Sequence, residues 1–465
     1  MPELHERAAS AIVGLVRDRT VSRREVVEAH LDRIDAVDGE VCAFVERRER
    51  DAVLAEADAA DRNHDARAAL PLDGVAVSIK DHFDVEGMRH TEGVAALADR
   101  CSPGNSLVVQ RLLDAGAFIL GKCNQPDFQI RWNTVNDLYP PTRNPRDLSR
   151  TPGGSSGGDA AAVAAGMAAL GLGADYGGSI RVPASFCGLF GLRPSAGRVP
   201  HVQALDPEAG GMTLDLMNSI GPLARSLDDL WTAFQVLAGP DPRDPVSLPV
   251  ESLPAEARRA VRMSRETGAI VEPEIERELD RVCDALEQEG YEVVEGAIPN
   301  AKRAPELWAE LIGAELLHWA LPAWDGVIAE GNRQHIEAMF GLFDLGGHVA
   351  RWGASYVERR KTAQATAQWM EQNPLVVAPV AGMPAPPLEF DFWLSDEDTR
   401  DLFDHMRDVV WVNLLSLPSI ALPNGIQIVA RRFREADALA AARVAAEALG
   451  PVLIANPRGG PDGEG

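Results

Sequence analysis

Residues 153–178 form a run of small residues that restricts how this chain can fold. The run begins with GGSSGG, continues as the alanine-rich DAAAVAAGMAALGLGAD and ends with YGG. Alanine and glycine lack the bulk that keeps backbones apart, so such a segment packs closely against its neighbours. We therefore expect a helix and a short strand here, at the centre of the fold.

The glycine-serine run at 153–158 has two interpretations. Short glycine-serine sequences are typical of flexible linkers. Glycines directly before a helix also let backbone N–H groups point into a cleft. This run precedes a strong helical pattern. Taken alone, it fits a flexible linker and a functional loop equally well.

A second motif, YGGSIR, places Ser179 after two glycines at the expected end of a strand. Backbone N–H groups in such a turn can converge on one point, as the binding of an oxyanion requires. An ordinary tight turn is the alternative. A nucleophilic serine also needs a base. His82 and His90 lie in loop-like sequence that matches no catalytic motif. YGGSI does not match the G-x-S-x-G elbow of the α/β-hydrolases. The sequence therefore gives no support to a Ser–His–Asp triad, and a serine paired with a lysine base is the alternative.

Lysine is rare in this chain, with four lysines among 45 basic residues. Arginine keeps its proton in proteins, whereas a buried lysine can lose it and act as a base. Lys80 ends the apolar run 75–79, and burial there would lower its pKa. Composition alone leaves Lys122 as a rival.

The composition limits compartment and partners. The net charge of −25 disfavours nucleic acid and anionic membranes as partners. No segment approaches the about 18 consecutive apolar residues of a membrane span, and the N-terminus lacks a signal-peptide pattern. The five cysteines form no CxxC pair. We therefore expect a cytoplasmic protein without a metal site.

Strand and helix patterns alternate along the chain, which predicts an α/β fold with a sheet covered on both faces. Ser22 and Glu25 fit a capping box that begins an early helix. No linker divides the chain, so we expect one domain over residues 1–455. Its segments are a helical N-terminal part (1–70), a core (71–240), a helical variable region (241–373), a C-terminal sheet and helix (374–455), and a disordered tail (456–465).

The whole chain resembles the amidase signature family. The resemblance rests on VSIKDHFDVEG, GKCN, TRNPRDLSRTPGGSSGG, YGGSIRVPASFCGLFGLRPSAGRVP and GPLARSLDDL, which occur in the family's order. It spans roughly residues 5 to 450. It implies the amidase-signature fold, a single domain with a large, mixed, twisted β-sheet between helices.

The resemblance also implies a Ser–cisSer–Lys triad. The matching residues are Lys80 as base, Ser155 as the cis-serine that relays a proton, and Ser179 as nucleophile. The family's 24-residue spacing between the serines selects Ser155 over Ser156. The backbone N–H groups of Tyr176, Gly177, Gly178 and Ser179 would bind the oxyanion of an acyl-enzyme pathway, with no cofactor and no metal.

The chain departs from many relatives at four positions. Tyr176 stands where threonine is common, and a phenol there would narrow the pocket. Arg131, Trp132 and Asn133 stand where many relatives have glycine and serine, in a segment that runs beside the substrate in the family. We hypothesise that Arg131 pairs with a polar acceptor of the substrate and that Trp132 forms a wall. The alternative is a solvated arginine and a core tryptophan. Trp308 has the helical spacing typical of a core and is left outside the site.

Two functions follow from the resemblance. The first is an amidase that hydrolyses the carboxamide C–N bond of a small or medium-sized substrate and releases ammonia or an amine. The alternative is the glutaminase (A-type) subunit of a tRNA-dependent amidotransferase. The intact Lys80, Ser155 and Ser179 argue against a third interpretation, a catalytically dead binding module. The expected partner is a small-molecule amide, and a homodimer remains open. The amide itself cannot be read from the sequence.

Overall fold

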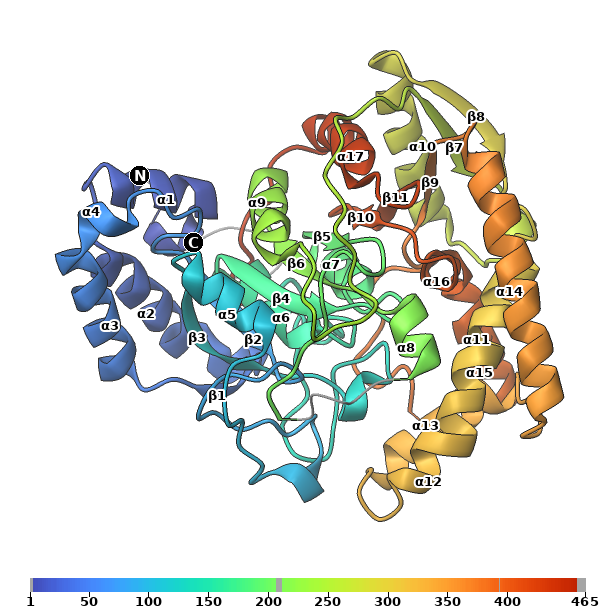
Figure 1. Cartoon of the computed structure of the whole chain (residues 1–465), viewed down its shortest axis with the longest axis horizontal. Coiled ribbons are helices and arrows are strands. Elements are labelled where there is room, and N and C mark those ends of the chain that lie inside the picture. The colour runs from blue at the N-terminus through green and yellow to red at the C-terminus, as the bar shows by residue number, and fades with distance from the viewer. Residues whose placement is uncertain (1–2, 206–210, 393, 458–465) are drawn as a thin grey trace.

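A computed structural model describes residues 3–205, 211–392 and 394–457 of the chain. Its centre is one mixed sheet of eleven strands, in the order β1-β3-β2-β4-β6-β5-β10-β11-β9-β7-β8. Helices pack on both faces of the sheet (Figure 1). The predicted fold class is confirmed.

The first half of the sheet contains a parallel trio that positions the site. β2 (Ala76–Lys80) lies between β3 (Phe118–Cys123) and β4 (Leu170–Ala174) and runs parallel to both. All three strands are buried along their whole length, as strands covered on both faces should be. The antiparallel strand β1 (Phe44–Arg47) forms the edge.

The second half of the sheet is mixed. Antiparallel pairing joins β4 to β9 through four strands, and β7 and β8 then run parallel to β9. These strands are β5 (Phe190–Arg193), β6 (Ile220–Ala224), β7 (Arg259–Met263), β8 (Glu292–Gly296), β9 (Leu375–Pro379), β10 (Ser419–Ala421) and β11 (Ile426–Ala430).

Two groups of helices flank the sheet at its ends (Figure 1). The N-terminal group comprises α1 (Ala9–Arg17), α2 (Arg23–Val41), α3 (Arg50–Arg62), α4 (His64–Arg67) and α5 (Leu107–Asp114). At the opposite end lie α10 (Pro273–Gln288), α11 (Arg303–Glu315), α12 (Leu321–Ala323), α13 (Glu330–Gly341), α14 (Val349–Met370) and α15 (Asp396–His405).

The remaining helices lie near the middle of the chain or at its C-terminal end. They are α6 (Gly157–Ala164), α7 (Arg181–Cys187), α8 (Met212–Met217), α9 (Leu227–Leu237), α16 (Arg407–Leu414) and α17 (Glu435–Leu449). Single turns of 3₁₀-helix occur at Leu4–Glu6, Ala95–Leu97, Asp127–Gln129 and Arg265–Thr267, and a π-helical turn at Leu316–Ala320.

The small-residue run forms α6 and β4 at the centre of the fold, as expected. All eight residues of α6 are buried. A Cβ atom added to Gly158 would lie 2.5 Å from the backbone N of Asn124, and one added to Gly157 would lie 2.1 Å from Thr134 Oγ1. Only glycine permits this approach, which explains why the run is rich in glycine.

Several local expectations are confirmed and others are not. The capping box at Ser22 and Glu25 begins α2. The segment expected to be helical at 1–70 also contains β1, a short edge strand. The sequence IGPLA at 220–224 forms strand β6. From residue 458 the predicted disordered tail lies outside the described residues, and the four segment boundaries stay predictions.

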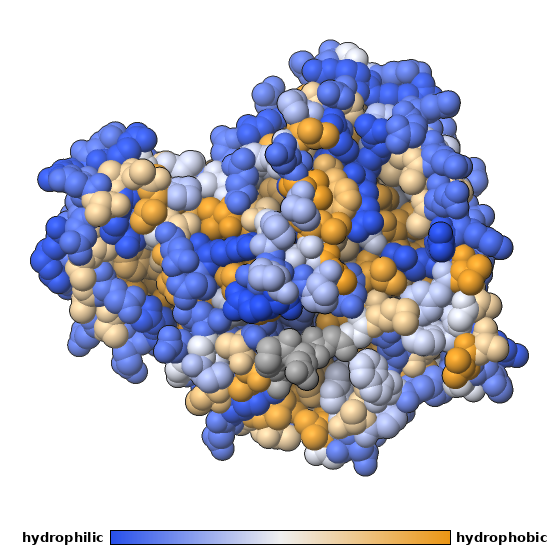
Figure 2. Space-filling view, in the orientation of Figure 1, coloured by the Kyte–Doolittle hydropathy of each residue, from blue (hydrophilic) through white to orange (hydrophobic). Residues whose placement is uncertain are grey.

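The hydrophobic side chains of each strand alternate between two faces. In β2, Val77 and Ile79 pack in a core with α1, α5 and α9, whereas Ala76 packs on the other face with α2 and α3. Polar residues cover much of the periphery of the molecule (Figure 2). Among the described helices, none combines the length and the apolar character needed to cross a bilayer.

Candidate active site

Lys80 ends β2 and reaches a serine from a distant loop. Its side chain is completely buried, and its Nζ donates a hydrogen bond to Ser155 Oγ at 2.7 Å. Ser155 is also buried and follows a cis peptide bond with Gly154. The neighbouring Ser156 makes a different contact, because its Oγ lies 3.4 Å from the Ala174 carbonyl oxygen. The structure thus joins Lys80 to Ser155, the serine that the family spacing selects.

Burial determines the electrostatics of this pair. Loss of solvation lowers the pKa of Lys80 to about 7, against the opposing effect of the Asp159, Glu92 and Asp175 carboxylates. Burial also raises the pKa of Asp159 to about 7, although Ser78 Oγ donates to its carboxylate at 2.8 Å. The amine of Lys80 can therefore be neutral near neutral pH, as a base must be.

The rival lysine lies in a different environment. Lys122, on β3, is fully buried as well. Its Nζ donates to the Arg89 carbonyl oxygen at 3.1 Å and lies 3.5 Å from the carboxylate of Asp81. Lys122 thus binds groups of the loop after β2, and no serine is among these partners.

Ser179 lies just before α7, in a loop that one carboxylate organises. Asp175 is fully buried and accepts the backbone N–H of Gly178 at 2.8 Å and that of Ile180 at 3.2 Å. Its other main partner is the Arg181 guanidinium, with Nε at 2.9 Å, and this cation holds the pKa of Asp175 well below its usual range. The loop is therefore rigidly tied to the start of α7.

This arrangement divides the four expected oxyanion donors. The Gly178 N–H is committed to Asp175, so it is not free for a ligand. The N–H groups of Tyr176, Gly177 and Ser179 donate to no acceptor among the residues that the structure describes. Three donors thus remain where four were expected, since the side chain of Asp175 competes for the fourth.

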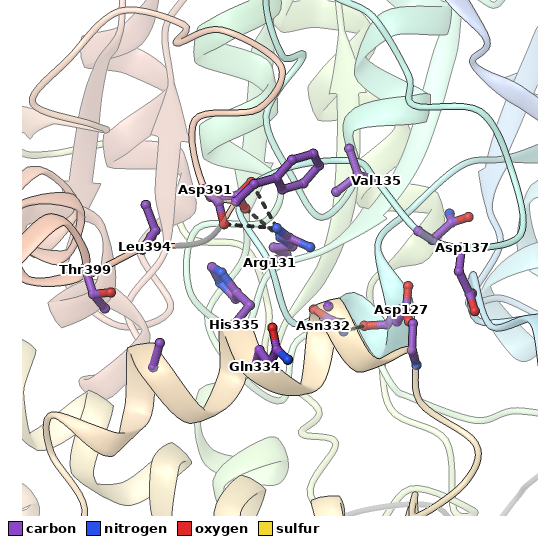
Figure 3. A pocket seen from close by; sticks show the side chains of 15 residues that line it. Asp127, Arg131, Val135, Asp137, Asn332, Gln334, His335, Asp391, Leu394 and Thr399 are labelled. Atoms are coloured by element: carbon purple, nitrogen blue, oxygen red, sulfur yellow. Dashed lines mark hydrogen bonds and ion pairs between the residues drawn. The ribbon is translucent and has the colours of Figure 1, made fainter. Parts of the chain in front are cut away.

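Ser179 faces a small cavity of about 40 Å³. Its walls are mainly apolar and include Trp132, Tyr176, Trp308, Ile312, Met339 and Phe340. A larger cavity of about 560 Å³ lies next to it, and Arg131 and His335 belong to the walls of both. Figure 3 shows this outer cavity, whose lining is more polar and includes Asp127, Asn332 and Asp391. Ser179 thus lies at an apolar inner cavity that adjoins a more polar outer cavity.

Comparison with known proteins identifies the family of this site. The model of the amidase family matches residues 25–439. The chain belongs to the amidase family. It is 32% identical to the indoleacetamide hydrolase of Bradyrhizobium diazoefficiens over 453 residues, which cover 92% of this chain and 83% of that one. It is 33% identical to the A-type subunit of the glutamyl-tRNA(Gln) amidotransferase of Koribacter versatilis, over 94% of this chain and 97% of that one.

Solved structures agree with the sequence comparison. A bacterial aryl acylamidase of the amidase signature family superposes with a TM-score of 0.82 at 26% identity, covering 96% of this chain and 97% of that one. The family that the motifs suggested is confirmed, and this amidase is an amide-hydrolysing enzyme.

Two tryptophans hold the loop that leads to Ser179 in this amidase. Trp132 Nε1 donates to the Gly177 carbonyl oxygen at 2.8 Å, and Trp308 Nε1 donates to the Tyr176 carbonyl oxygen at 3.0 Å. The two indoles stack with ring centroids 6.1 Å apart. A Cβ atom on Gly177 would lie 2.3 Å from the Trp308 ring, so only glycine fits beneath it. Sequence reasoning missed Trp308, because its spacing on α11 is that of any buried helical residue.

Arg131 is paired within the chain. Its Nε lies 2.6 Å from Asp391 Oδ2, its Nη2 lies 3.2 Å from Oδ1, and its guanidinium lies over the Phe392 ring (Figure 3). Asn133 Nδ2 also donates to Asp391 Oδ1 at 2.8 Å. The arginine is neither solvated nor unpaired, since Asp391 already supplies a carboxylate. Contact of Arg131 or Trp132 with a substrate stays a prediction.

The hydroxyl of Tyr176 is tied into a chain of polar groups. It hydrogen bonds to Thr213 Oγ1, which in turn donates to the carboxylate of Glu315 on α11. Burial raises the pKa of the Tyr176 phenol well above its usual value, so it stays neutral. Tyr176 is among the residues that line the inner cavity, and narrowing of the pocket by its phenol stays a prediction.

Proposed function

We propose that this protein is an amidase that hydrolyses a small or medium-sized, apolar carboxamide through a Ser179–Ser155–Lys80 triad. The observation that carries the proposal is the contact of 2.7 Å between Lys80 Nζ and Ser155 Oγ at a fully buried site. A desolvated amine with a pKa of about 7 can take a proton from a hydroxyl.

The proposed reaction uses only groups of the chain. Neutral Lys80 accepts the proton of Ser155 Oγ, which accepts the proton of Ser179 Oγ as that oxygen attacks the carbonyl carbon. The N–H groups of Tyr176, Gly177 and Ser179 stabilise the resulting oxyanion. The C–N bond breaks as the leaving nitrogen takes the proton back through Ser155. Water then attacks the acyl-enzyme by the same proton path and releases the carboxylic acid.

The walls of the inner cavity support an apolar acyl group. Trp132, Trp308, Ile312, Met339 and Phe340 offer it apolar surface, and the arginine in the wall, Arg131, is already paired. Burying the apolar surface of an acyl group in this recess would favour binding by about 25 cal/mol per Å². The similarity to an indoleacetamide hydrolase agrees with a substrate whose acyl part is apolar.

The glutaminase alternative requires a site that binds the charged groups of glutamine. Free glutamine carries an ammonium and a carboxylate, and burying either without a partner is costly. The relatives that belong to amidotransferases keep this alternative open. Hydrolysis of glutamine that requires a partner protein and tRNA would replace our proposal, whereas hydrolysis of uncharged amides by the isolated chain supports it.

The decisive experiment is intact-protein mass spectrometry after treatment with a fluorophosphonate. Wild type should gain one adduct, and Ser179→Ala should gain none. Ser156→Ala is the matched control, because this neighbouring serine does not contact Lys80 and its variant should still react. An adduct that persists in Ser179→Ala would refute the assignment of the nucleophile. Hydrolysis of butyramide, phenylacetamide and glutamine by wild type then tests the preference for apolar acyl groups.

A further inference from the structure

A cluster of imidazoles and carboxylates lies in the loop that follows β2. His82 Nδ1 and His90 Nε2 face the same oxygen of Glu92, Oε1, at 2.8 and 3.0 Å. The three candidate ligand atoms lie within 4.8 Å of one another. The side chains of His82, His90 and Glu92 are 14%, 4% and 11% exposed, so the cluster is enclosed but open to solvent on one side.

Asp84 fixes the orientation of His90. Its Oδ1 lies 2.6 Å from His90 Nδ1 and accepts a hydrogen bond from Ser102 Oγ at 2.6 Å. Its Oδ2 accepts the backbone N–H groups of Ala204 and Leu205 at 2.7 and 2.9 Å. A carboxylate held this firmly keeps the proton on Nδ1, so the lone pair of a neutral His90 is on Nε2 and points toward Glu92.

His201 gives His82 a matching arrangement. His82 Nε2 lies 3.0 Å from His201 Nε2, which also receives Gln203 Nε2 at 3.4 Å. Gln203 Oε1 accepts the backbone N–H of Asp84, so its Nε2 faces His201 Nε2 as a donor and that ring nitrogen acts as an acceptor. The proton of a neutral His82 then belongs on Nε2, and its lone pair is on Nδ1. This nitrogen also points toward Glu92 Oε1.

Two lone pairs and one carboxylate oxygen thus converge on one point. With these tautomers, each contact with Glu92 Oε1 places a nitrogen lone pair against a carboxylate oxygen. A divalent cation satisfies the same contacts with both rings neutral. The second oxygen of the carboxylate, Glu92 Oε2, is occupied, because Gln125 Nε2 donates to it at 2.7 Å. Oε1 is therefore the oxygen available to a metal.

We propose that His82 Nδ1, His90 Nε2 and Glu92 Oε1 form a binding site for a divalent transition metal ion, with Zn²⁺ as the best match. Two imidazoles and one carboxylate are a ligand set that zinc uses, with a fourth position left to water. Asp84 behind His90 and His201 behind His82 are the outer partners that fix the tautomers of metal-binding histidines. This proposal does not rest on the proposed amidase function.

The three ligand atoms must shift to reach tetrahedral geometry. Tetrahedral ligands about 2.1 Å from zinc lie about 3.4 Å apart, so Glu92 Oε1 must move by about half an ångström from each imidazole. Glu92 has a φ of 53°, a conformation that is uncommon for glutamate and that is often retained at functional sites. We expected no metal site because the cysteines lack metal-binding spacing. The proposed site uses histidine and glutamate ligands, which the cysteine pattern cannot predict.

Isothermal titration of Zn²⁺ into the untagged, EDTA-treated full chain tests the proposal. We expect one strongly bound Zn²⁺ per chain and a higher melting temperature with the metal present. Co²⁺ substitution should give the visible spectrum of nitrogen and oxygen ligation, without the charge-transfer band of thiolates. The same results should be obtained with Ser179→Ala, which separates this site from the catalytic proposal.

Variants identify the ligands. Glu92→Gln, which preserves shape, and His90→Ala should each weaken Zn²⁺ binding at least about 100-fold, and Asp84→Asn about 10- to 100-fold as an outer partner. His318→Ala is the matched control, because His318 pairs with one carboxylate, Asp344, outside the cluster, and it should leave the affinity unchanged. Absence of Zn²⁺ binding by wild type would overturn the proposal. So would unchanged affinity in folded Glu92→Gln and His90→Ala.

Discussion

Lys80 Nζ lies 2.7 Å from Ser155 Oγ, although 75 residues separate the two in the sequence. The contact joins the end of β2 to the loop before α6 in a region without solvent access. Because Lys80 is buried among apolar strands and paired with a hydroxyl, its pKa is lowered by loss of solvation. The activity and the stability of the protein should therefore depend on pH and on this side chain.

The activity of the enzyme should rise with pH. Lys80 must be neutral to accept a proton, and burial lowers its pKa to about 7. The neutral fraction increases as the pH rises through that value, so kcat/KM should increase through about pH 7 and then level off. A pH profile on an uncharged amide measures this. A kcat/KM that is constant or falling across neutral pH would contradict Lys80 as the base.

Replacement of Lys80 by arginine should abolish turnover. A guanidinium remains protonated in proteins, so the arginine of Lys80→Arg carries a permanent charge and cannot act as a base. We expect kcat/KM to fall by at least about 10³-fold. Lys361→Arg, on the exposed face of α14, is the matched control and should retain activity. Substantial activity in a folded Lys80→Arg enzyme would rule out the proposed mechanism.

Lys80→Met should make the protein more stable and change how stability depends on pH. The unfolded lysine titrates near 10.5 and the folded one near 7, so the unfolded chain binds more protons between these values. Wild-type stability therefore gains from a rise in pH in that window, by an amount of the order of a few kcal/mol. The variant lacks this contribution. Melting temperatures of both proteins from about pH 7 to 10 should converge as the pH rises; parallel curves would contradict the shifted pKa.

The sequence was sufficient to predict the central parts of the fold. Buried strands such as β2 and β9 are short apolar runs between turn residues, and α6 is a nearly pure alanine-glycine helix. The contact of Lys80 with Ser155 followed from motif resemblance, since both motifs have a fixed place in the family. Edge strand β1 was missed, because its residues FVER have neither a long apolar run nor a clear alternation.

The surroundings of the site were harder to predict. Asp391 pairs with Arg131 across 260 residues, and no local pattern reports a contact of that range. Trp308 lies on a helix that is buried on several sides, so its spacing does not distinguish a core residue from one that touches the loop before Ser179. The competition of Asp175 for the Gly178 N–H depends on a side-chain orientation that only the folded loop defines.

Trp308 should affect turnover through the position of the loop that carries the proposed nucleophile, Ser179. Trp308→Phe removes the N–H that binds the Tyr176 carbonyl but keeps an aromatic wall, so kcat should fall by about 10-fold with little change in KM. Trp308→Ala also enlarges the inner cavity and should shift preference from butyramide toward bulkier amides. Trp231→Phe, at a tryptophan on α9 that does not line the cavity, is the control. Equal kinetics of wild type and both Trp308 variants would show that the loop does not need this support.

The Arg131–Asp391 pair should act mainly on stability. Asp391 is buried, so Arg131→Ala leaves a carboxylate without its cation and should cost about 3–5 kcal/mol. Arg131→Met combined with Asp391→Leu removes both charges and should recover part of that loss. Denaturant unfolding measures the two effects. Because the guanidinium is already paired, KM for an uncharged amide should change less than about threefold in folded Arg131→Ala. A KM raised more than about tenfold, with stability unchanged, would instead show that Arg131 binds the substrate.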